Sequence, residues 1–256
     1  MKPVEVSLEQ VLLARENRAG RQQRLLAQYG LPLVSFTMNM AGPVKDTPLS
    51  RFAFQAGVAA LTKRLGGPVS CCLTEAVTGC EALLVYDRPA QVLKDVCMEL
   101  ESTEVGRLYD LDVLDAAGEK LSRPEMRRCL VCGGPVAVCS RSRAHGLDAI
   151  CAETTRRLAE FACTTLGDLA ADALREEAAL SPKPGLVDSC TNGAHTDMDL
   201  ALMLCSAETL RPWFCRMVRL GLDGAAPAQL QNTGRQAEAE MLQATGGVNT
   251  HKGALY

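Results

Sequence analysis

The stretch Gly106-Arg107-Leu108-Tyr109-Asp110-Leu111-Asp112-Val113-Leu114-Asp115 decides how the rest of the chain is interpreted. Aliphatic and β-branched residues crowd it and glycines flank it at Gly106 and Gly118, so we predict a β-strand. Side chains alternate between the two faces of a strand. Asp110 and Asp112 are therefore expected to share one face, while the apolar residues between them point into a core.

The acidic pair on this strand has two interpretations. Carboxylates side by side on a sheet repel each other, which costs stability. A hard cation such as Mg²⁺ would relieve the repulsion, and such an ion is usually shared with the phosphates of a substrate. The alternative is a solvent-exposed sheet face that carries two acids. Asp-x-Asp is a common pattern, so the pair taken alone favours this alternative.

The composition is that of a globular protein. Of the 256 residues 47% are hydrophobic and 22% charged, and the net charge is −3. No block of Lys or Arg suggests a nucleic-acid-binding face, and no apolar window approaches the roughly 18 residues of a membrane span. Most of the twelve cysteines stand singly in apolar segments, as reduced thiols do, and the N-terminus has no secretory leader. We therefore expect a cytoplasmic protein with neither a membrane nor a nucleic-acid partner.

The order of elements in the first half predicts an α+β domain. After a helix over residues 7–28, periodicity and turn signals predict strand, helix, strand, strand, helix and strand. The segments are 31–40, a helix from Thr47 to the glycines at 66–67, 69–74, 80–87, a helix from Pro89 and the acidic strand at 107–114. This is the split βαβ pattern. We predict a ferredoxin-like or nucleotidyltransferase-like sheet with helices over residues 1–148.

The turn at residues 41–46 is a candidate anion site. It leads into a helix whose first backbone amides are unpaired, and such a helix start attracts anions. Lys45 would add a positive charge beside it. An ordinary connection between a strand and a helix explains the same residues and is the simpler interpretation.

Three thiols and one imidazole lie close together in the sequence at Cys129, Cys132, Cys139 and His145. They have the ligand types of a closed tetrahedral zinc site, and the glycines at 133–134 allow the tight turn of a Cys-x-x-Cys knuckle. The spacing of the second half departs from standard zinc-finger patterns. The alternatives are packed thiols beside a surface histidine, or a redox pair. The redox pair is less favoured because no thioredoxin-like βαβ unit frames it.

From about Asp148 the pattern becomes helical, and we predict an all-α domain over residues 149–256. Its irregular stretch at 181–188 contains two prolines, which prevent regular structure. A second group of candidate metal ligands follows at His195, Asp197 and Asp199. On a loop these side chains would converge on one cation, whereas on a helix His195 and Asp199 would share a face.

Four stretches of the first half resemble one enzyme family. They are PLVSFT at 32–37, GPVKD at 42–46, GRLYDLDV at 106–113 and RRCLVCGGPVAVCSRSRAH at 127–145. They are similar to holo-citrate lyase synthase, the CitX-type apo-citrate lyase phosphoribosyl-dephospho-CoA transferase. The resemblance covers about residues 7–150, and its motifs together are specific.

This resemblance implies a transferase that moves a phosphoribosyl-dephospho-CoA group from its triphosphate form to a serine of the citrate lyase acyl carrier protein and releases diphosphate. Such chemistry depends on positioning and on charge neutralisation, with Mg²⁺ bridging phosphate oxygens. The resemblance makes Asp110 and Asp112 the catalytic candidates, as magnesium ligands. The candidates for holding the diphosphate are Lys45, Arg51 and Arg107.

Three stretches of the second half resemble a different family. They are LSPKPGLVD at 180–188, NGAHTDMDL at 192–200 and EAEMLQATGGVNTHKGALY at 238–256. They are similar to triphosphoribosyl-dephospho-CoA synthase, the CitG type, which joins ATP to dephospho-CoA with loss of adenine. The resemblance implies Mg²⁺ at His195, Asp197 and Asp199, with Lys183 and Lys252 on the phosphates. That family continues beyond the last motif, so we expect a partial, apparently truncated domain without synthase activity.

Two other classes of function stay open at this point. One is a generic nucleotidyltransferase that acts on a small molecule, which a requirement for a folded acyl carrier protein would exclude. The other is a non-enzymatic zinc-knuckle interaction module fused to a helical docking domain. Bound zinc without Mg²⁺-dependent release of diphosphate would favour the module.

Overall fold

A computed structural model describes residues 4–124 and 126–255 of the chain. It consists of two compact units, Met1–Leu158 and Ala159–Tyr256, and the division falls within the long helix α5 (Leu147–Ala179). The sequence-based boundary between residues 148 and 149 lies at the start of the same helix. None of the helices in the described ranges is both long and apolar enough to cross a membrane.

The first unit is built on a four-stranded antiparallel sheet with the strand order β2-β3-β1-β4. One helix connects β1 to β2 and another connects β3 to β4, so the split βαβ prediction of an α+β, ferredoxin-like domain is confirmed. In chain order the elements are α1 (Leu8–Tyr29), β1 (Leu33–Met38), α2 (Pro48–Leu65), β2 (Ser70–Thr74), β3 (Glu81–Val85), α3 (Ala90–Glu101), the 3₁₀ turn η1 (Gly106–Leu108), β4 (Tyr109–Leu114) and α4 (Val136–Ser142).

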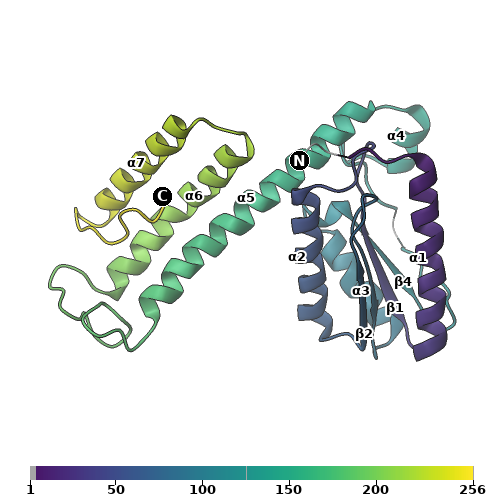
Figure 1. Ribbon diagram of the computed structural model, residues 1–256, viewed down its shortest axis with the longest axis horizontal. Coiled ribbons are helices and arrows are strands. Elements are labelled where there is room, and N and C mark those ends of the chain that lie inside the picture. Colours follow the sequence, from purple (N-terminus) through teal and green to yellow (C-terminus); the bar gives the residue numbers. More distant parts are fainter. Residues whose placement is uncertain (1–3, 125, 256) are drawn as a thin grey trace. The chain divides into compact units, whose positions relative to one another are not determined.

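Helices cover both faces of the sheet, with α1 on one side and α2 on the other (Figure 1). On the α2 side the ring of Phe36 stacks on Phe54 at 4.7 Å between centroids and meets the edge of Tyr109 at 5.0 Å. On the α1 side Leu25 and Leu26 pack against the buried residues of β1 and β3. Both faces of the central strands are therefore buried, which explains the apolar character of β3.

The helix starts follow the sequence signals. Ser7 and Gln10 form a capping box at α1, and Thr47 and Ser50 form one at α2, with Pro48 at the first helical position. The start of the acidic strand was predicted too early, because residues 106–108 form η1 and β4 begins at Tyr109. A Cβ atom on Gly106 would lie 1.8 Å from the carbonyl oxygen of Leu100, so this glycine lets the chain turn closely against the end of α3.

Replacing Gly57 by alanine is expected to destabilise the first unit, although alanine is the better helix former by about 1 kcal/mol. A Cβ atom at this position in α2 would lie 2.7 Å from two ring carbons of Phe36 and 3.1 Å from the ring of Tyr109. We expect a net loss of about 1–3 kcal/mol, as for other overpacked cores. Thermal unfolding followed by circular dichroism measures the change.

Gly20→Ala in α1 is the matched control, because no atom lies within 4 Å of its added Cβ. It is expected to stabilise the protein by about 0.5–1 kcal/mol. Equal stabilisation by both substitutions would contradict close packing of the aromatic cluster.

The second unit is helical, as predicted, and contains α6 (Leu200–Leu222) and α7 (Pro227–Ala244) with the later part of α5. Its buried cluster joins Leu210 of α6 to Ala237 and Met241 of α7. A Cβ atom on Gly167 of α5 would lie 2.9 Å from the backbone nitrogen of Cys215, so this glycine allows α5 and α6 to approach closely. The long irregular connection from α5 to α6 carries the proline-containing stretch.

Candidate functional site

A cavity of about 870 Å³ in the first unit gathers arginines from several elements. It lies among the end of α3, η1 and the segment from residue 123 to 154. Five of the described residues that line it are arginines, and Glu101 is the one acid among them. The arginines are Arg107, Arg123, Arg127, Arg128 and Arg143. Arginine presents a fork of N–H donors that matches phosphate oxygens, so the cavity is suited to a polyanion.

Glu101, the last residue of α3, organises two of these arginines. It is 6% exposed and accepts a hydrogen bond of 2.9 Å from the backbone N–H of Leu111, on the edge strand β4. Its carboxylate is paired with Arg123 and, at 2.6 Å, with Arg127. One buried carboxylate thus holds two guanidinium groups. The positive charge of the cavity exceeds its negative charge, so it can attract a negatively charged ligand.

Arg107 lies among other positive charges at the cavity. Burial lowers its pKa, and the positive charges of Arg157 and Arg127 lower it further. Its guanidinium donates to the backbone carbonyl of Arg128, which fixes its direction. A bound anion would relieve this repulsion. A group with such a perturbed pKa inside a cavity is a candidate for a functional site.

Asp110 and Asp112 share the half-buried face of β4, while the residues between and beside them are buried. Each carboxylate has a basic partner: Asp110 lies 3.2 Å from Arg127 and Asp112 lies 2.7 Å from Lys120. Because Arg127 also binds Glu101, the acidic pair is connected to the arginine cavity. The shared face is as predicted, and the role as magnesium ligands stays a prediction.

Two of the predicted phosphate ligands in the first unit lie elsewhere. Lys45 donates to the carbonyl of Met40, and burial lowers its pKa. Arg51 is exposed and is bound by Asp46 at 2.6 Å and by Glu75 at 3.2 Å. Neither side chain lines the cavity, whereas Arg107 does. In this structure Arg51 is thus paired with two carboxylates, and its role in holding diphosphate stays a prediction.

The arginines that sequence reasoning missed are those at positions 123, 127, 128 and 143. The sequence did contain an indication of them, because these arginines flank the Cys/His cluster within one short segment. Two of them, Arg123 and Arg127, are held together by Glu101, which is distant from them in the sequence, and no local pattern marks that residue.

The Cys/His cluster forms part of the same cavity wall, with Cys129, Cys139 and His145 among the lining residues. One ligand atom from each of the four residues lies within 4.8 Å of the others, and the sulfurs of Cys132 and Cys139 are 3.4 Å apart. The thiols are free of disulfides. Backbone amides of Cys132 and Val131 lower the pKa of the Cys129 thiol, whereas contact with the Cys132 sulfur raises that of Cys139 to about 11.

In the second unit the structure separates the predicted magnesium ligands. The imidazole Nδ1 of His195 lies 3.8 Å from Asp197, but Asp199 caps α6 by accepting from the amide of Leu202 at 2.8 Å. Among the described residues, the Cys/His cluster is the one place where three or more possible metal ligands lie close together. His195, Asp197 and Asp199 are therefore not gathered around a common point.

A smaller cavity of about 240 Å³ lies beside this loop and is lined by Lys183 and His195. Lys183 is paired with Glu177 at 3.1 Å, and Lys252 is exposed and does not line this cavity. Sequence reasoning missed Asp188, which is 4% exposed. The backbone amides of Lys183, Cys190 and Thr191 lower its pKa to about 2, so its carboxylate holds the proline-containing loop together.

Comparison with known proteins places family matches on both units. The family model of apo-citrate lyase phosphoribosyl-dephospho-CoA transferase matches residues 6–161, and that of ATP:dephospho-CoA triphosphoribosyl transferase matches residues 163–256. Protein CitXG of Haemophilus influenzae is 38% identical over 98% of this chain and 57% of its own length. Protein CitXG of Leuconostoc mesenteroides is 31% identical over 98% of this chain and 59% of its own length. The chain thus spans less than two thirds of these two-part relatives.

A shorter relative matches part of this chain over almost its own full length. The probable apo-citrate lyase phosphoribosyl-dephospho-CoA transferase of Vibrio cholerae is 39% identical over 62% of this chain and 94% of its own length. The stretch it matches is thus nearly the whole of that protein.

Proposed function

Because the chain belongs to the apo-citrate lyase phosphoribosyl-dephospho-CoA transferase family, as the sequence resemblance predicted, we propose that its first unit carries out that transfer. The donor is triphosphoribosyl-dephospho-CoA and the acceptor is a serine of the citrate lyase acyl carrier protein. The serine hydroxyl loses its proton to the solvent as its oxygen forms a bond to the phosphorus that carries the ribose. The bond from that phosphorus to the diphosphate oxygen breaks, and diphosphate leaves with the electron pair.

The arginine cavity is the observation that carries this proposal. Diphosphate leaves with several negative charges, and arginines placed around a developing charge before the reaction stabilise the transition state. Arg107, whose guanidinium is fixed by the carbonyl of Arg128, and Arg127, held by Glu101, are two of these arginines. A volume of about 870 Å³ suits a small-molecule ligand, since such sites usually span roughly 300–1,000 Å³.

The remaining lining of the cavity suits the rest of the donor. Apolar side chains such as Met98, Leu130 and Ile150 lie beside the arginines. Dephospho-CoA combines charged phosphates with an apolar pantetheine arm, so a cavity with both kinds of lining is appropriate. This combination favours the CoA-linked donor over a small polar nucleotide.

Asp110 and Asp112 fit Mg²⁺, because this ion commonly takes one or two carboxylates together with the phosphates of a substrate. When bound, the ion would supply charge neutralisation at the reacting phosphate. Both carboxylates are partly exposed, and their partners Arg127 and Lys120 keep them close to basic side chains. Arg127 therefore orients Asp110 as well as lining the cavity.

For the second unit we propose a part in making the donor, in line with the family match over residues 163–256. Lys183 and His195 line its small cavity and are the candidates for contact with the phosphates of ATP or dephospho-CoA. Binding of ATP measured by isothermal titration calorimetry, with Lys183→Ala as the variant, tests this assignment. Equal binding by the variant would contradict it.

The experiment for the first unit is the intact mass of apo-acyl carrier protein after incubation with the chain, Mg²⁺ and triphosphoribosyl-dephospho-CoA. We expect a mass increase equal to the transferred arm, with one diphosphate released for each arm. Diphosphate release without the acyl carrier protein would favour a generic nucleotidyltransferase. If a folded chain forms neither the modified acyl carrier protein nor diphosphate, the proposal is contradicted.

Arg128→Ala is expected to lower kcat/KM for the donor by about 10- to 100-fold, because a charge-assisted hydrogen bond contributes about 1.5–3 kcal/mol. Arg64→Ala is the matched control, since Arg64 is half exposed, is paired with Glu99 and does not line the cavity. Equal rates for Arg128→Ala and the control would contradict a phosphate-binding role for this side chain.

A further inference from the structure

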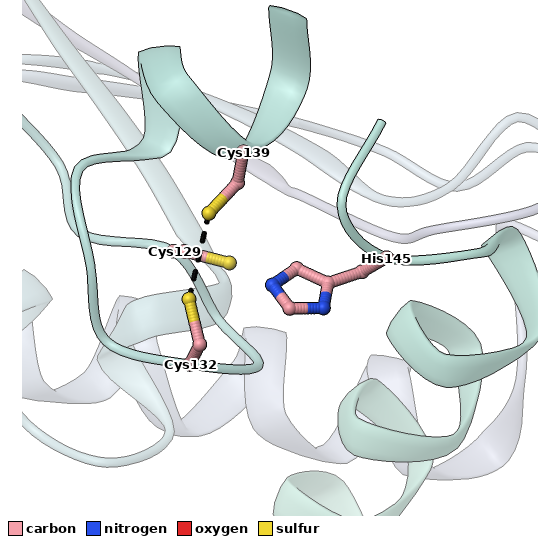
Figure 2. Close-up of side chains that lie close together, drawn as sticks. All are labelled: Cys129, Cys132, Cys139 and His145. Atoms are coloured by element: carbon pink, nitrogen blue, oxygen red, sulfur yellow. Dashed lines mark hydrogen bonds between the residues drawn. The ribbon is translucent and has the colours of Figure 1, made fainter. Parts of the chain in front are cut away.

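We propose that Cys129, Cys132, Cys139 and His145 bind one structural Zn²⁺ through three sulfur atoms and the imidazole Nε2. The four side chains converge from a turn, from α4 and from the segment after it, and Figure 2 shows them facing a common centre. The first two residues lie on the turn and the third lies on α4.

The spacing of the sulfur atoms suits a tetrahedral ion. The four ligand atoms lie within 4.8 Å of one another, and the closest sulfurs, those of Cys132 and Cys139, are 3.4 Å apart. In a tetrahedral site with zinc–sulfur bonds of about 2.3 Å, the sulfurs are about 3.8 Å apart. A disulfide needs about 2.05 Å, so the observed arrangement is nearer to a metal site.

The backbone around Cys129 forms the tight knuckle that such sites use. The amide of Gly133 donates to the carbonyl of Cys129 at 3.0 Å, and the amide of Cys129 donates to the carbonyl of Gly134 at 2.6 Å. Gly133 has a φ of +70°, a conformation that favours glycine. The amides of Val131 and Cys132 are directed at the Cys129 sulfur, where they would stabilise a thiolate ligand.

The imidazole of His145 lacks a partner that its position requires. Its Nε2 is buried and forms no hydrogen bond within the part of the chain that the structure describes. An unsatisfied buried polar atom costs about 1–3 kcal/mol. The ring points toward the three sulfurs, so a metal ion at their centre would satisfy this nitrogen (Figure 2).

The donor set selects the metal and its role. Three thiolates and one imidazole are soft and intermediate ligands, which favour zinc over magnesium or calcium. Four protein ligands complete a tetrahedron and leave no open position for water or substrate, as in structural zinc sites. The ion would therefore shape the chain and take no direct part in the reaction.

A zinc ion here would fix one wall of the arginine cavity. Arg127 and Arg128 directly precede Cys129, and Arg143 lies between Cys139 and His145. The metal would hold these guanidinium groups at the cavity by tying both ends of the segment together.

The first test is the metal content of the full chain, purified under reducing conditions without added metal and measured by mass spectrometry of the elements. We expect about one zinc ion per chain, less than a tenth of that in Cys132→Ser, and full content in Cys71→Ser. Cys71 is the matched control, because it is an exposed cysteine of the same unit outside the cluster. If the wild-type chain contains no zinc and takes none up from zinc chloride, the proposal is overturned.

A second measurement covers the case in which Cys132→Ser fails to fold. The wild-type chain, stripped of metal and titrated with Co²⁺, should show the strong visible absorption of a tetrahedral thiolate site, and zinc should abolish it. A mass two units lower, from a disulfide between two cluster cysteines, with no metal uptake would overturn the proposal. Neither readout uses the transferase reaction, so failure of the metal site and failure of the proposed function are distinguishable.

Discussion

Asp112→Asn is expected to lower the rate of prosthetic-group transfer by on the order of a thousandfold while the first unit stays folded. The substitution keeps the shape of the side chain and removes its charge. If the carboxylates of β4 hold Mg²⁺ against the donor phosphates, losing one ligand removes several kcal/mol of transition-state stabilisation. Asp110→Asn should behave alike. The double variant should be little slower than either single variant, because the two carboxylates act as one unit.

The contacts of the two carboxylates make this experiment decisive. If Asp112 only forms an ion pair with Lys120, its removal should change stability by at most about 1 kcal/mol, since both side chains are partly exposed. Transfer would then be unaffected. The same reasoning applies to Asp110 and Arg127. The ion-pair role and the magnesium-ligand role thus predict similar melting temperatures for these variants. The transfer rates that the two roles predict differ by orders of magnitude.

Asp115→Asn is the control for loss of charge near the same strand. Asp115 follows β4 and accepts hydrogen bonds from the backbone amides of Ala117 and Glu119, each at 2.9 Å. The amide oxygen of asparagine can accept both bonds, so the fold and the rate should change little. Label transfer to the acyl carrier protein and the melting temperature are measured for all variants. Transfer near the wild-type rate by Asp110→Asn or Asp112→Asn would refute the site assignment.

Local patterns in the sequence were sufficient for the sheet and for the faces of its strands. Alternation along β4 predicts the shared face of Asp110 and Asp112, because side-chain direction in a strand follows from position alone. Capping residues predict the starts of α1 and α2 for the same reason. The predicted start of the strand at residue 107 was too early, because the conformation at Gly106 depends on the end of α3, which no pattern within the strand encodes.

The arginine cavity could not be predicted, because it is made by contacts between distant segments. Glu101 selects Arg123 and Arg127, and these pairs form only after α3 packs beside β4. Arg51, which the family resemblance suggested as a diphosphate ligand, shows contacts of the same kind, because Asp46 and Glu75 bind it only in the folded chain. The Cys/His cluster was more predictable, because all four residues lie in one short segment.

Glu101→Ala is expected to destabilise the first unit by about 3 kcal/mol, because removal of one partner from a buried ion pair leaves the other charges uncompensated. Arg123 and Arg127 would lose their shared carboxylate, and the amide of Leu111 would lose its acceptor. The melting temperature should fall by about 6–12 °C. Affinity for the triphosphate donor should fall as well, because Arg127 would no longer be fixed at the cavity.

Two further variants separate the causes of this loss. Glu101→Gln keeps an oxygen that can accept from Leu111 but removes the charge, so its stability should lie between those of the wild type and Glu101→Ala. Glu99→Ala, two positions earlier on α3, removes a carboxylate that is paired with Arg64 and 58% exposed. An exposed pair contributes about 0–1 kcal/mol, so this control should melt close to the wild type. If Glu101→Ala melts no lower than Glu99→Ala, the buried carboxylate does not organise the arginines, and the cavity must be held in another way.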